Sequence, residues 1–186
     1  MNKKRQNLRQ IMKEKRAALS QTTHAEFSAA IVKHLRHSLK MPALKKSVGF
    51  CMPIQNEPNI LPFILESQKK GIITAMAKVL TKNAPLIFVP WKNGEPLEPD
   101  ACKIPAPIPS EKILPEILLI PLLAFDSKGF RLGYGGGYFD RTLAGNHFYS
   151  VGIGFEINRV DSVFPQKHDQ PLNAVVTEKG FFEFPR

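Results

Sequence analysis

A glycine-rich segment between charged residues is the part of this sequence best suited to chemistry. Residues 126–141 read DSKGFRLGYGGGYFDR and follow directly on the most apolar run of the chain, residues 117–125. The glycines at 133, 135, 136 and 137 allow positive φ angles, so successive amide hydrogens can turn toward one anion. A short helix is expected over residues 138–143, and the unpaired amides at its start favour a phosphate.

The spacing excludes the two commonest phosphate-binding glycine loops. No Gly-Lys-Ser/Thr follows, and the residue three after Gly135 is Tyr138, so neither the Walker pattern nor G-x-G-x-x-G is present. A glycine run alone also fits a tight strand-to-helix turn. Here Lys128 and Arg131 could neutralise phosphate while Asp140 holds a magnesium ion, as phosphoryl transfer requires. The segment therefore predicts a nucleotide or phosphate site.

The net charge of +10 is concentrated at the amino terminus. Residues 1–46 hold 12 of the 26 Lys and Arg residues and 2 of the 16 acidic ones, whereas residues 47–186 hold 14 of each. The basic segment predicts two helices, over residues 3–19 and 23–39. Thr23 and Glu26 have the spacing of a capping box at the start of the second helix.

The first of these helices combines an apolar stripe with a basic face. Leu8, Ile11, Met12 and Leu19 form the stripe, and the basic face carries Arg5, Arg9, Lys13 and Arg16. The helix can therefore dock on a core and aim arginines at an anion, although a solvated basic face fits the same pattern. No aromatic residue interleaves with these charges and no nucleic-acid motif is present, so we expect no nucleic-acid partner.

Beyond residue 46 the pattern changes to short apolar runs separated by turns. Strands are expected over residues 47–52, 72–79, 86–89, 117–121, 151–155 and 174–177, and a helix over residues 60–70. The proline-rich stretch 91–115 is expected to be an irregular connection. The alternation predicts one α/β domain over residues 1–186, an open and mostly parallel sheet covered by helices with an amino-terminal helical pair. Ligands should bind at the carboxyl ends of the strands, where the glycine loop also lies.

Composition is ordinary for a globular protein, with 43% hydrophobic and 23% charged residues. The longest apolar run is far short of the roughly 18 residues of a membrane span, and no signal peptide is recognised. We therefore expect a cytoplasmic protein without a membrane partner. Cys51 and Cys102 show no metal-ligand or C-x-x-C spacing and are interpreted as free thiols.

Two further acidic residues could belong to the site. Glu57 follows the first expected strand, where its carboxylate could accept hydrogen bonds from a ligand. Asp169 precedes the last strands and could join Asp140 around one cation, with His168 beside it. Each also fits an ordinary loop or turn residue, and the spacing leaves both interpretations open.

Several of these segments resemble the 5-formyltetrahydrofolate cyclo-ligase family, also called methenyltetrahydrofolate synthetase. The resemblance is specific at residues 123–126 (LAFD), Gly129, residues 131–141 (RLGYGGGYFDR) and residues 171–177 (PLNAVVT). It extends to Leu8-Arg9, residues 16–20 and the middle segment 91–107, so it covers nearly the whole chain.

The resemblance implies an ATP- and magnesium-dependent ligase of folate metabolism. In that reaction the formyl oxygen of 5-formyltetrahydrofolate is phosphorylated, and nitrogen 10 attacks the activated carbon. Loss of phosphate then gives 5,10-methenyltetrahydrofolate beside ADP. The expected partners are ATP and the folate, with or without a polyglutamate tail, and the protein is expected to be a monomer.

The resemblance also implies roles for individual residues. ATP would be held by Arg5, Arg9, Arg131, Leu132, Gly133, Tyr134, Gly135, Gly136, Gly137, Tyr138 and Phe139. The folate would contact Met52, Glu57, Trp91 and Tyr138, with Trp91 as a candidate for stacking on the pterin. Magnesium would be bound by Asp140 and Asp169.

This chain departs from the family pattern at four positions. Arg5 stands near a common lysine, Phe139 replaces a tyrosine, Ile60 stands for a threonine and Ile72 for a lysine. Two other classes of protein remain as alternatives. A nucleic-acid-binding module would explain the basic helices but leave the glycine loop without a purpose, and a metabolite-binding protein without activity would keep the loop yet form no product.

Overall fold

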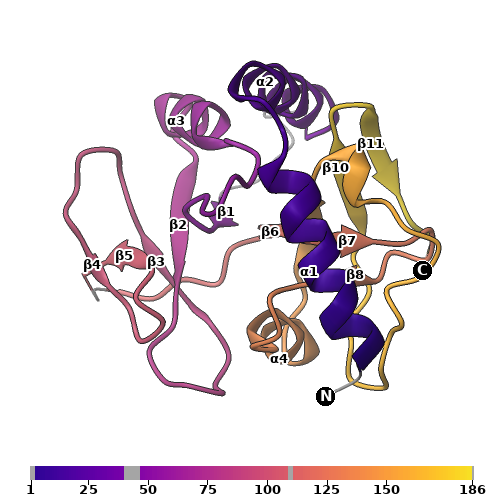
Figure 1. The fold of residues 1–186 in the computed structure, drawn as a ribbon. Helices are drawn as coiled ribbons and strands as arrows, with labels where there is room; N and C mark the ends of the chain where they lie inside the picture. The colour runs from indigo at the N-terminus through magenta and orange to yellow at the C-terminus, as the bar shows by residue number, and fades with distance from the viewer. Residues whose placement is uncertain (1–2, 40–46, 109–110, 186) are drawn as a thin grey trace.

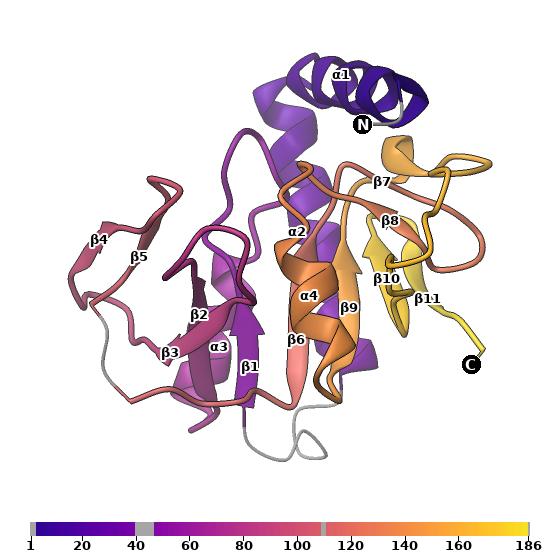
Figure 2. The same cartoon turned by 90° about the horizontal axis from the view of Figure 1, so that it is seen from below.

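The fold is built around an open sheet of short apolar strands. The computed structural model describes residues 3–39, 47–108 and 111–185, so the two ends of the basic segment, residues 1–2 and 40–46, lie outside it. Within these residues the main sheet has the strand order β11-β10-β9-β6-β1-β2-β3 (Figures 1 and 2). Its parallel strands are β1 (Ser47–Phe50), β2 (Ile73–Lys78), β6 (Ile117–Pro121), β9 (Tyr149–Ile153) and β10 (Ala174–Thr177). The antiparallel strands β3 (Ile87–Pro90) and β11 (Gly180–Glu183) form the two edges.

Helices cover both faces of this sheet. On one face, α2 (Gln21–Ser38) and α3 (Leu61–Lys69) pack on a core that includes Ile117 and Leu119 of β6. On the other face, α4 (Tyr138–Ala144) packs on Leu118 and Ile120 of the same strand. Figure 2 shows α4 on one side of the sheet and α2 with α3 on the opposite side. Because successive side chains of a strand point to opposite faces, a strand buried on both faces must be a continuous apolar run.

Helix α1 (Lys3–Ala17) crosses the end of the sheet toward which the parallel strands run (Figure 2). It docks through Met12 on the short hairpin of β7 (Ala124–Phe125) and β8 (Arg131–Leu132). A second hairpin, β4 (Leu97–Pro99) with β5 (Pro105–Pro107), extends from one side of the molecule (Figure 1). A 3₁₀ turn, η1, spans Glu156–Asn158.

The predicted fold class is confirmed, and β6 and β10 have the predicted bounds. Several local predictions are wrong. Helix α2 starts at Gln21 because Ser20 is its N-cap, accepting a hydrogen bond from the Thr23 amide at 3.1 Å, so Thr23 lies inside the helix. The proline-rich stretch contains the β4–β5 hairpin, although its residues 109 and 110 lie outside the described part. The pairs β4–β5 and β7–β8 and the edge strand β11 were not predicted.

The basic face of α1, for which the sequence left open a docked and a solvated arrangement, is partly buried. Ile11 of the expected apolar stripe is 40% exposed, whereas Arg5 and Arg16 of the basic face are buried. The helix therefore turns arginines toward the protein rather than toward solvent. Among the described helices, none is long and apolar enough to cross a membrane.

Candidate active site

A cavity of about 450 Å³ opens at the carboxyl end of the sheet. From β1 the chain continues to β2 on one side, and from β6 it continues to β9 on the other, so the topology reverses between these two strands. A crevice forms at such a reversal, because the connections after the two strands diverge. Met52, just after β1, and Pro121, at the end of β6, both line the cavity. Helix α1 and the glycine loop complete its wall.

Most of the predicted site residues meet at this cavity although they are far apart in the sequence. Those that line it are Arg5, Arg9, Met52, Glu57, Arg131, Gly133, Tyr134, Gly135, Gly136, Gly137, Tyr138, Phe139, Asp140 and Asp169. Leu132 lies in the same loop, but its side chain is buried in the small core beneath α1. Lys128 is exposed in the turn before the loop and is not part of the cavity wall.

The glycine loop owes its shape to two of its four glycines. Gly135 has φ +103° and Gly137 has φ +66°, both in the left-handed region that residues with a Cβ seldom adopt. Gly137 is also the N-cap of α4, which ends the loop. Gly133 and Gly136 lie outside the left-handed region, so two of the four glycines use the conformational freedom that the sequence offers.

Helix α1 holds the loop from the other side of the cavity. The Arg9 Nε donates a hydrogen bond to the carbonyl oxygen of Gly133 at 2.8 Å. Its Nη1 is buried and has no hydrogen-bond partner among the described residues. Burial, and secondarily the charge of Arg5, lowers the pKa of the Arg9 guanidinium. An unpartnered buried donor of this kind is costly unless a ligand accepts from it, which makes Arg9 suited to binding an anion.

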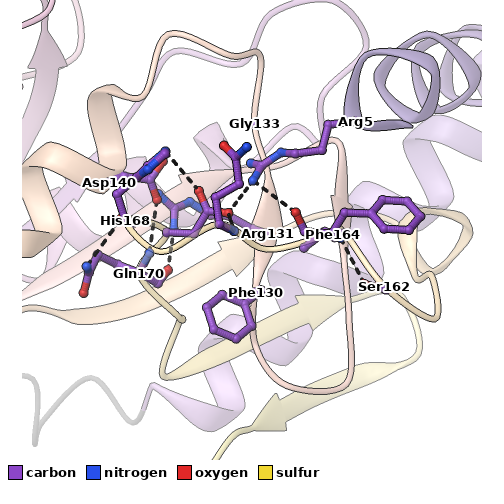
Figure 3. Close-up of polar contacts among 12 residues, drawn as sticks. Arg5, Phe130, Arg131, Gly133, Asp140, Ser162, Phe164, His168 and Gln170 are labelled. Carbon is purple, nitrogen blue, oxygen red and sulfur yellow. Dashed lines mark hydrogen bonds and ion pairs between the residues drawn. The ribbon is translucent and has the colours of Figure 1, made fainter. Parts of the chain in front are cut away.

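Two arginines pair with the two predicted metal ligands. The Arg131 Nη2 donates to Asp140 Oδ1 at 2.8 Å, and the Arg131 Nη1 donates to the Gln170 carbonyl oxygen at 2.7 Å. Arg5 forms an ion pair with Asp169 and a longer hydrogen bond, 3.4 Å, with the Phe164 carbonyl oxygen. Figure 3 shows Arg5 from α1 and Arg131 from β8 approaching the same segment around His168 and Gln170. Burial lowers the pKa of Arg131, and Asp140 opposes that shift.

The two carboxylates fit a cation that arrives with phosphate rather than a site made by protein ligands alone. No group of three or more His, Cys, Asp and Glu side chains that could hold a metal occurs among the described residues. Magnesium is commonly bound by one or two carboxylates together with substrate phosphates and water. Asp140 and Asp169 both line the cavity and offer such oxygen ligands, each with one oxygen engaged by an arginine.

Glu57 is held in place beside the glycine loop by two hydrogen bonds. Its Oε1 accepts from the Tyr134 hydroxyl at 2.6 Å, and its Oε2 accepts from the Ile54 amide at 3.0 Å. A tight turn returns the chain to this position, with Gln55 and Asn56 at φ 48° and 58°. Burial raises the pKa of Glu57, and the hydrogen bonds from Tyr134 and Ile54 oppose that increase.

Trp91 is a predicted folate contact that the structure does not bring to the cavity. It is 5% exposed, and its ring packs beside Phe50 with the centroids 6.0 Å apart. Its Nε1 donates to the Glu95 carbonyl oxygen at 3.2 Å. Since the indole is fixed within the core, it cannot stack on a ligand in this cavity, and the prediction for Trp91 is corrected to a packing role.

Several residues of the site were not predicted from the sequence. The backbone of Gln166 donates to Asp169, and that of Gln170 donates to Asp140. No local pattern indicates these contacts, because they depend on where the chain runs before β10. Arg16 donates to the Tyr134 hydroxyl at 2.6 Å. The position of Arg16 on the basic face of α1, seven residues after Arg9, is the sequence feature that could have indicated its role.

Comparisons with known proteins identify the family of this chain. Residues 1–178 match the model of the 5-formyltetrahydrofolate cyclo-ligase family. The 5-formyltetrahydrofolate cyclo-ligase of Haemophilus influenzae is 28% identical over 178 residues, covering 91% of this chain and 95% of the relative. The enzyme of the same name from Escherichia coli K12 is 35% identical over 107 residues, or 53% of this chain and 59% of the relative.

Solved structures show the same likeness. The 5,10-methenyltetrahydrofolate synthetase of Aquifex aeolicus superposes with a TM-score of 0.85 at 25% identity, covering 98% of this chain and 93% of the other. A 5,10-methenyltetrahydrofolate synthetase from Mycoplasma pneumoniae, at 24% identity and a TM-score of 0.76, shares the fold over 96% of this chain and 99% of its own. With the match extending over residues 1–178, this chain belongs to the 5-formyltetrahydrofolate cyclo-ligase family.

Proposed function

We propose that this protein converts 5-formyltetrahydrofolate and ATP into 5,10-methenyltetrahydrofolate, ADP and phosphate. Family membership and the names of its relatives in Haemophilus influenzae and Aquifex aeolicus support this activity. The observation that carries the proposal is the cavity itself. It combines a glycine loop, the cationic side chains of Arg5 and Arg9 and two carboxylates with the buried carboxylate of Glu57.

ATP would bind on the side of the glycine loop. Arg9 supports this assignment, because its Nη1 is buried without a hydrogen-bond partner among the described residues while its Nε holds the loop at Gly133. A guanidinium can donate two parallel hydrogen bonds to a phosphate. Arg5, Arg131 and the loop residues 132–139 complete the proposed nucleotide site.

Magnesium would bind beside the phosphates, with Asp140 and Asp169 as its protein ligands. When bound, the ion would offset negative charge on the phosphates. The protein contributes two hard oxygen ligands held by neighbouring arginines. Because Arg5 and Arg131 neutralise these carboxylates, the cavity does not present two uncompensated negative charges to the nucleotide.

The folate would bind on the side of Glu57, with Met52 and Tyr138 as further contacts. The Glu57 carboxylate is suited to accepting hydrogen bonds from the amino and ring N–H groups of a pterin. It is 5% exposed, and charge-assisted hydrogen bonds strengthen in such a partly dry environment. Trp91 is left out of this assignment because of its position in the core.

The proposed chemistry asks the protein mainly to position two substrates. The formyl oxygen attacks the γ-phosphorus and ADP leaves; nitrogen 10 then attacks the formyl carbon and gives up its proton. That attack closes the five-membered ring, and departure of phosphate, which carries the former formyl oxygen, then leaves the methenyl carbon between the two nitrogens. Holding the reactants in line and stabilising the charge that spreads over the phosphate are the two contributions expected from the cavity residues. A monomeric state, a cytoplasmic location and the use of polyglutamylated folate stay predictions.

The proposed function is tested by incubating the purified chain with 5-formyltetrahydrofolate while the methenyl product is followed by its absorbance. Product should form only when ATP and magnesium are both present. Equal product without ATP, or none from folded protein under any condition, would contradict the proposal. Salt-dependent RNA binding without ATP turnover would instead favour a nucleic-acid-binding module, although the burial of Arg5 and Arg16 speaks against a basic surface.

A further inference from the structure

Arg16 is almost completely buried although it belongs to the most basic helix of the chain. It is 1% exposed, and it does not line the cavity. Its Nε and Nη1 have no hydrogen-bond partner among the described residues. Burying a guanidinium without a directly bonded carboxylate is unfavourable, so the fold must compensate for it elsewhere. The polar group that Arg16 does contact is the hydroxyl of Tyr134.

A chain of hydrogen bonds links Arg16 to the cavity. The Arg16 Nη2 donates to the Tyr134 hydroxyl oxygen, which in turn donates to Glu57 Oε1, and both distances are 2.6 Å. Since Arg16 can only donate, it directs the single hydroxyl hydrogen of Tyr134 toward the carboxylate. The Arg16 guanidinium also lies 5.8 Å from the centroid of the Tyr134 ring. Three separate segments, α1, the glycine loop and the turn after β1, are joined in this way.

We propose that Arg16 is a positioning residue for the folate: acting through the Tyr134 hydroxyl, it orients the Glu57 carboxylate and stabilises its anionic form. This inference rests on the proposed function, which assigns Glu57 to the folate. Arg16 itself touches neither substrate. It also links the two halves of the cavity, because Tyr134 belongs to the proposed nucleotide loop and Glu57 to the proposed folate side.

The surroundings of Glu57 explain why a cation is useful there. Burial raises the pKa of Glu57, whereas the hydrogen bond from Tyr134 and the charge of Arg16 lower it. Two other titratable groups near Glu57, His24 and Cys51, do not stabilise its carboxylate anion. His24 of α2 contacts the Glu57 backbone carbonyl oxygen at 3.0 Å rather than the carboxylate. The Cys51 thiol, at the end of β1, has its pKa raised by burial and by Glu57 itself. Arg16 is the member of this group that reaches the carboxylate through the Tyr134 hydroxyl.

The first test needs no ligand. The chain is labelled with ¹³C at the glutamate carboxyl carbons, and the Glu57 signal is assigned by its absence in Glu57→Gln. Its titration midpoint should move to higher pH in Arg16→Met and in Tyr134→Phe, and less in Arg16→Lys, which keeps the charge. In the double variant the shift should be smaller than the sum of the two, because Arg16 acts through Tyr134. Arg36→Met, an exposed arginine paired with Glu66, is the matched control and should leave the midpoint unchanged.

The second test measures the dissociation constant of 5-formyltetrahydrofolate without ATP. At neutral pH, Arg16→Met should weaken folate binding by about tenfold, and raising the pH should restore it as Glu57 ionises. A purely structural defect would not be restored in this way. Should Arg16→Met fail to fold, Arg16→Lys and Tyr134→Phe provide the same comparison.

The outcomes separate this inference from the proposed function. Unshifted Glu57 midpoints in folded Arg16 and Tyr134 variants would overturn the positioning role alone. Normal folate binding by Glu57→Gln would instead contradict the assignment of Glu57 to the folate, on which the inference rests.

Discussion

The Arg131 guanidinium and the Asp140 carboxylate lie 2.8 Å apart on the wall of the cavity. They are nine positions apart in the sequence, with the whole glycine loop between them. The ion pair therefore closes the base of the loop, since β8 begins at Arg131 and Asp140 lies in the first turn of α4. The same pair fixes the carboxylate that is proposed to bind magnesium.

Removing the charge of either proposed magnesium ligand should impair the reaction. Asp140→Asn and Asp169→Asn keep an oxygen that can accept from Arg131 or Arg5, so the fold should persist. A neutral amide is a weaker ligand for a hard cation, and turnover should fall by on the order of 10- to 100-fold at limiting magnesium. Steady-state rates over a magnesium titration test this. Asp161→Asn, at an exposed site outside the cavity wall, is the control. Wild-type rates in both variants would contradict the proposed magnesium ligation and leave Asp140 and Asp169 with structural roles only.

Arg9 should matter more for ATP than for the folate. Arg9→Ala removes the unpartnered Nη1 and the hydrogen bond to Gly133, so the apparent ATP constant should rise about tenfold. The apparent folate constant should change little. Initial rates with each substrate varied in turn distinguish the two effects, and Arg36→Ala on α2 serves as an exposed control. Unchanged ATP affinity would mean that Arg9 only anchors the loop.

The parallel strands of the sheet could be predicted from the sequence because they are short apolar runs, largely buried, whereas the half-exposed edge strand β11 was missed. β6 shows this directly, with Leu118 and Leu119 in different cores. The arginines of α1 could not be placed in this way. Arg5 meets Asp169 and Arg16 meets Tyr134 across 164 and 118 residues, and no local pattern encodes a partner at that distance. A basic helical face is usually exposed to solvent, so the sequence pattern alone favours solvent exposure of these arginines.

The glycine loop and Trp91 show the same difference between features set by the local sequence and features set by distant contacts. The glycine motif could be recognised in the sequence because Gly135 and Gly137 adopt positive φ angles, which favour glycine over other residues. The motif in turn identified the cavity that it lines. Whether a tryptophan stacks on a ligand or packs inside depends on its neighbours in the fold. For Trp91, which follows β3, those neighbours include Phe50 at the end of β1.

Two glycines of the loop should differ sharply in their tolerance of alanine. At Gly137, φ is +66° and an added Cβ would lie 2.8 Å from the Arg141 Nη1, so Gly137→Ala should lower the free energy of unfolding by about 1 to 2 kcal/mol. Gly133 is not left-handed and has no atom within 4 Å of an added Cβ, which makes Gly133→Ala the matched control. Denaturant unfolding of the ligand-free variants measures both. Equal stability of the two variants would contradict the role given to the Gly137 backbone.

The folate side of the cavity should depend on the charge of Glu57. Tyr134 and Ile54 both donate to this carboxylate, so in Glu57→Gln the amide nitrogen must face one of two donors. The variant therefore loses the anionic acceptor and disturbs its orientation at once. Charge-assisted hydrogen bonds are worth roughly 1.5 to 3 kcal/mol, so the apparent folate constant should rise about tenfold or more while ATP affinity stays nearly intact. Glu14→Gln, an exposed glutamate on α1, should leave both constants unchanged. Lost ATP binding with normal folate binding would mean that the two sides of the cavity are assigned in reverse.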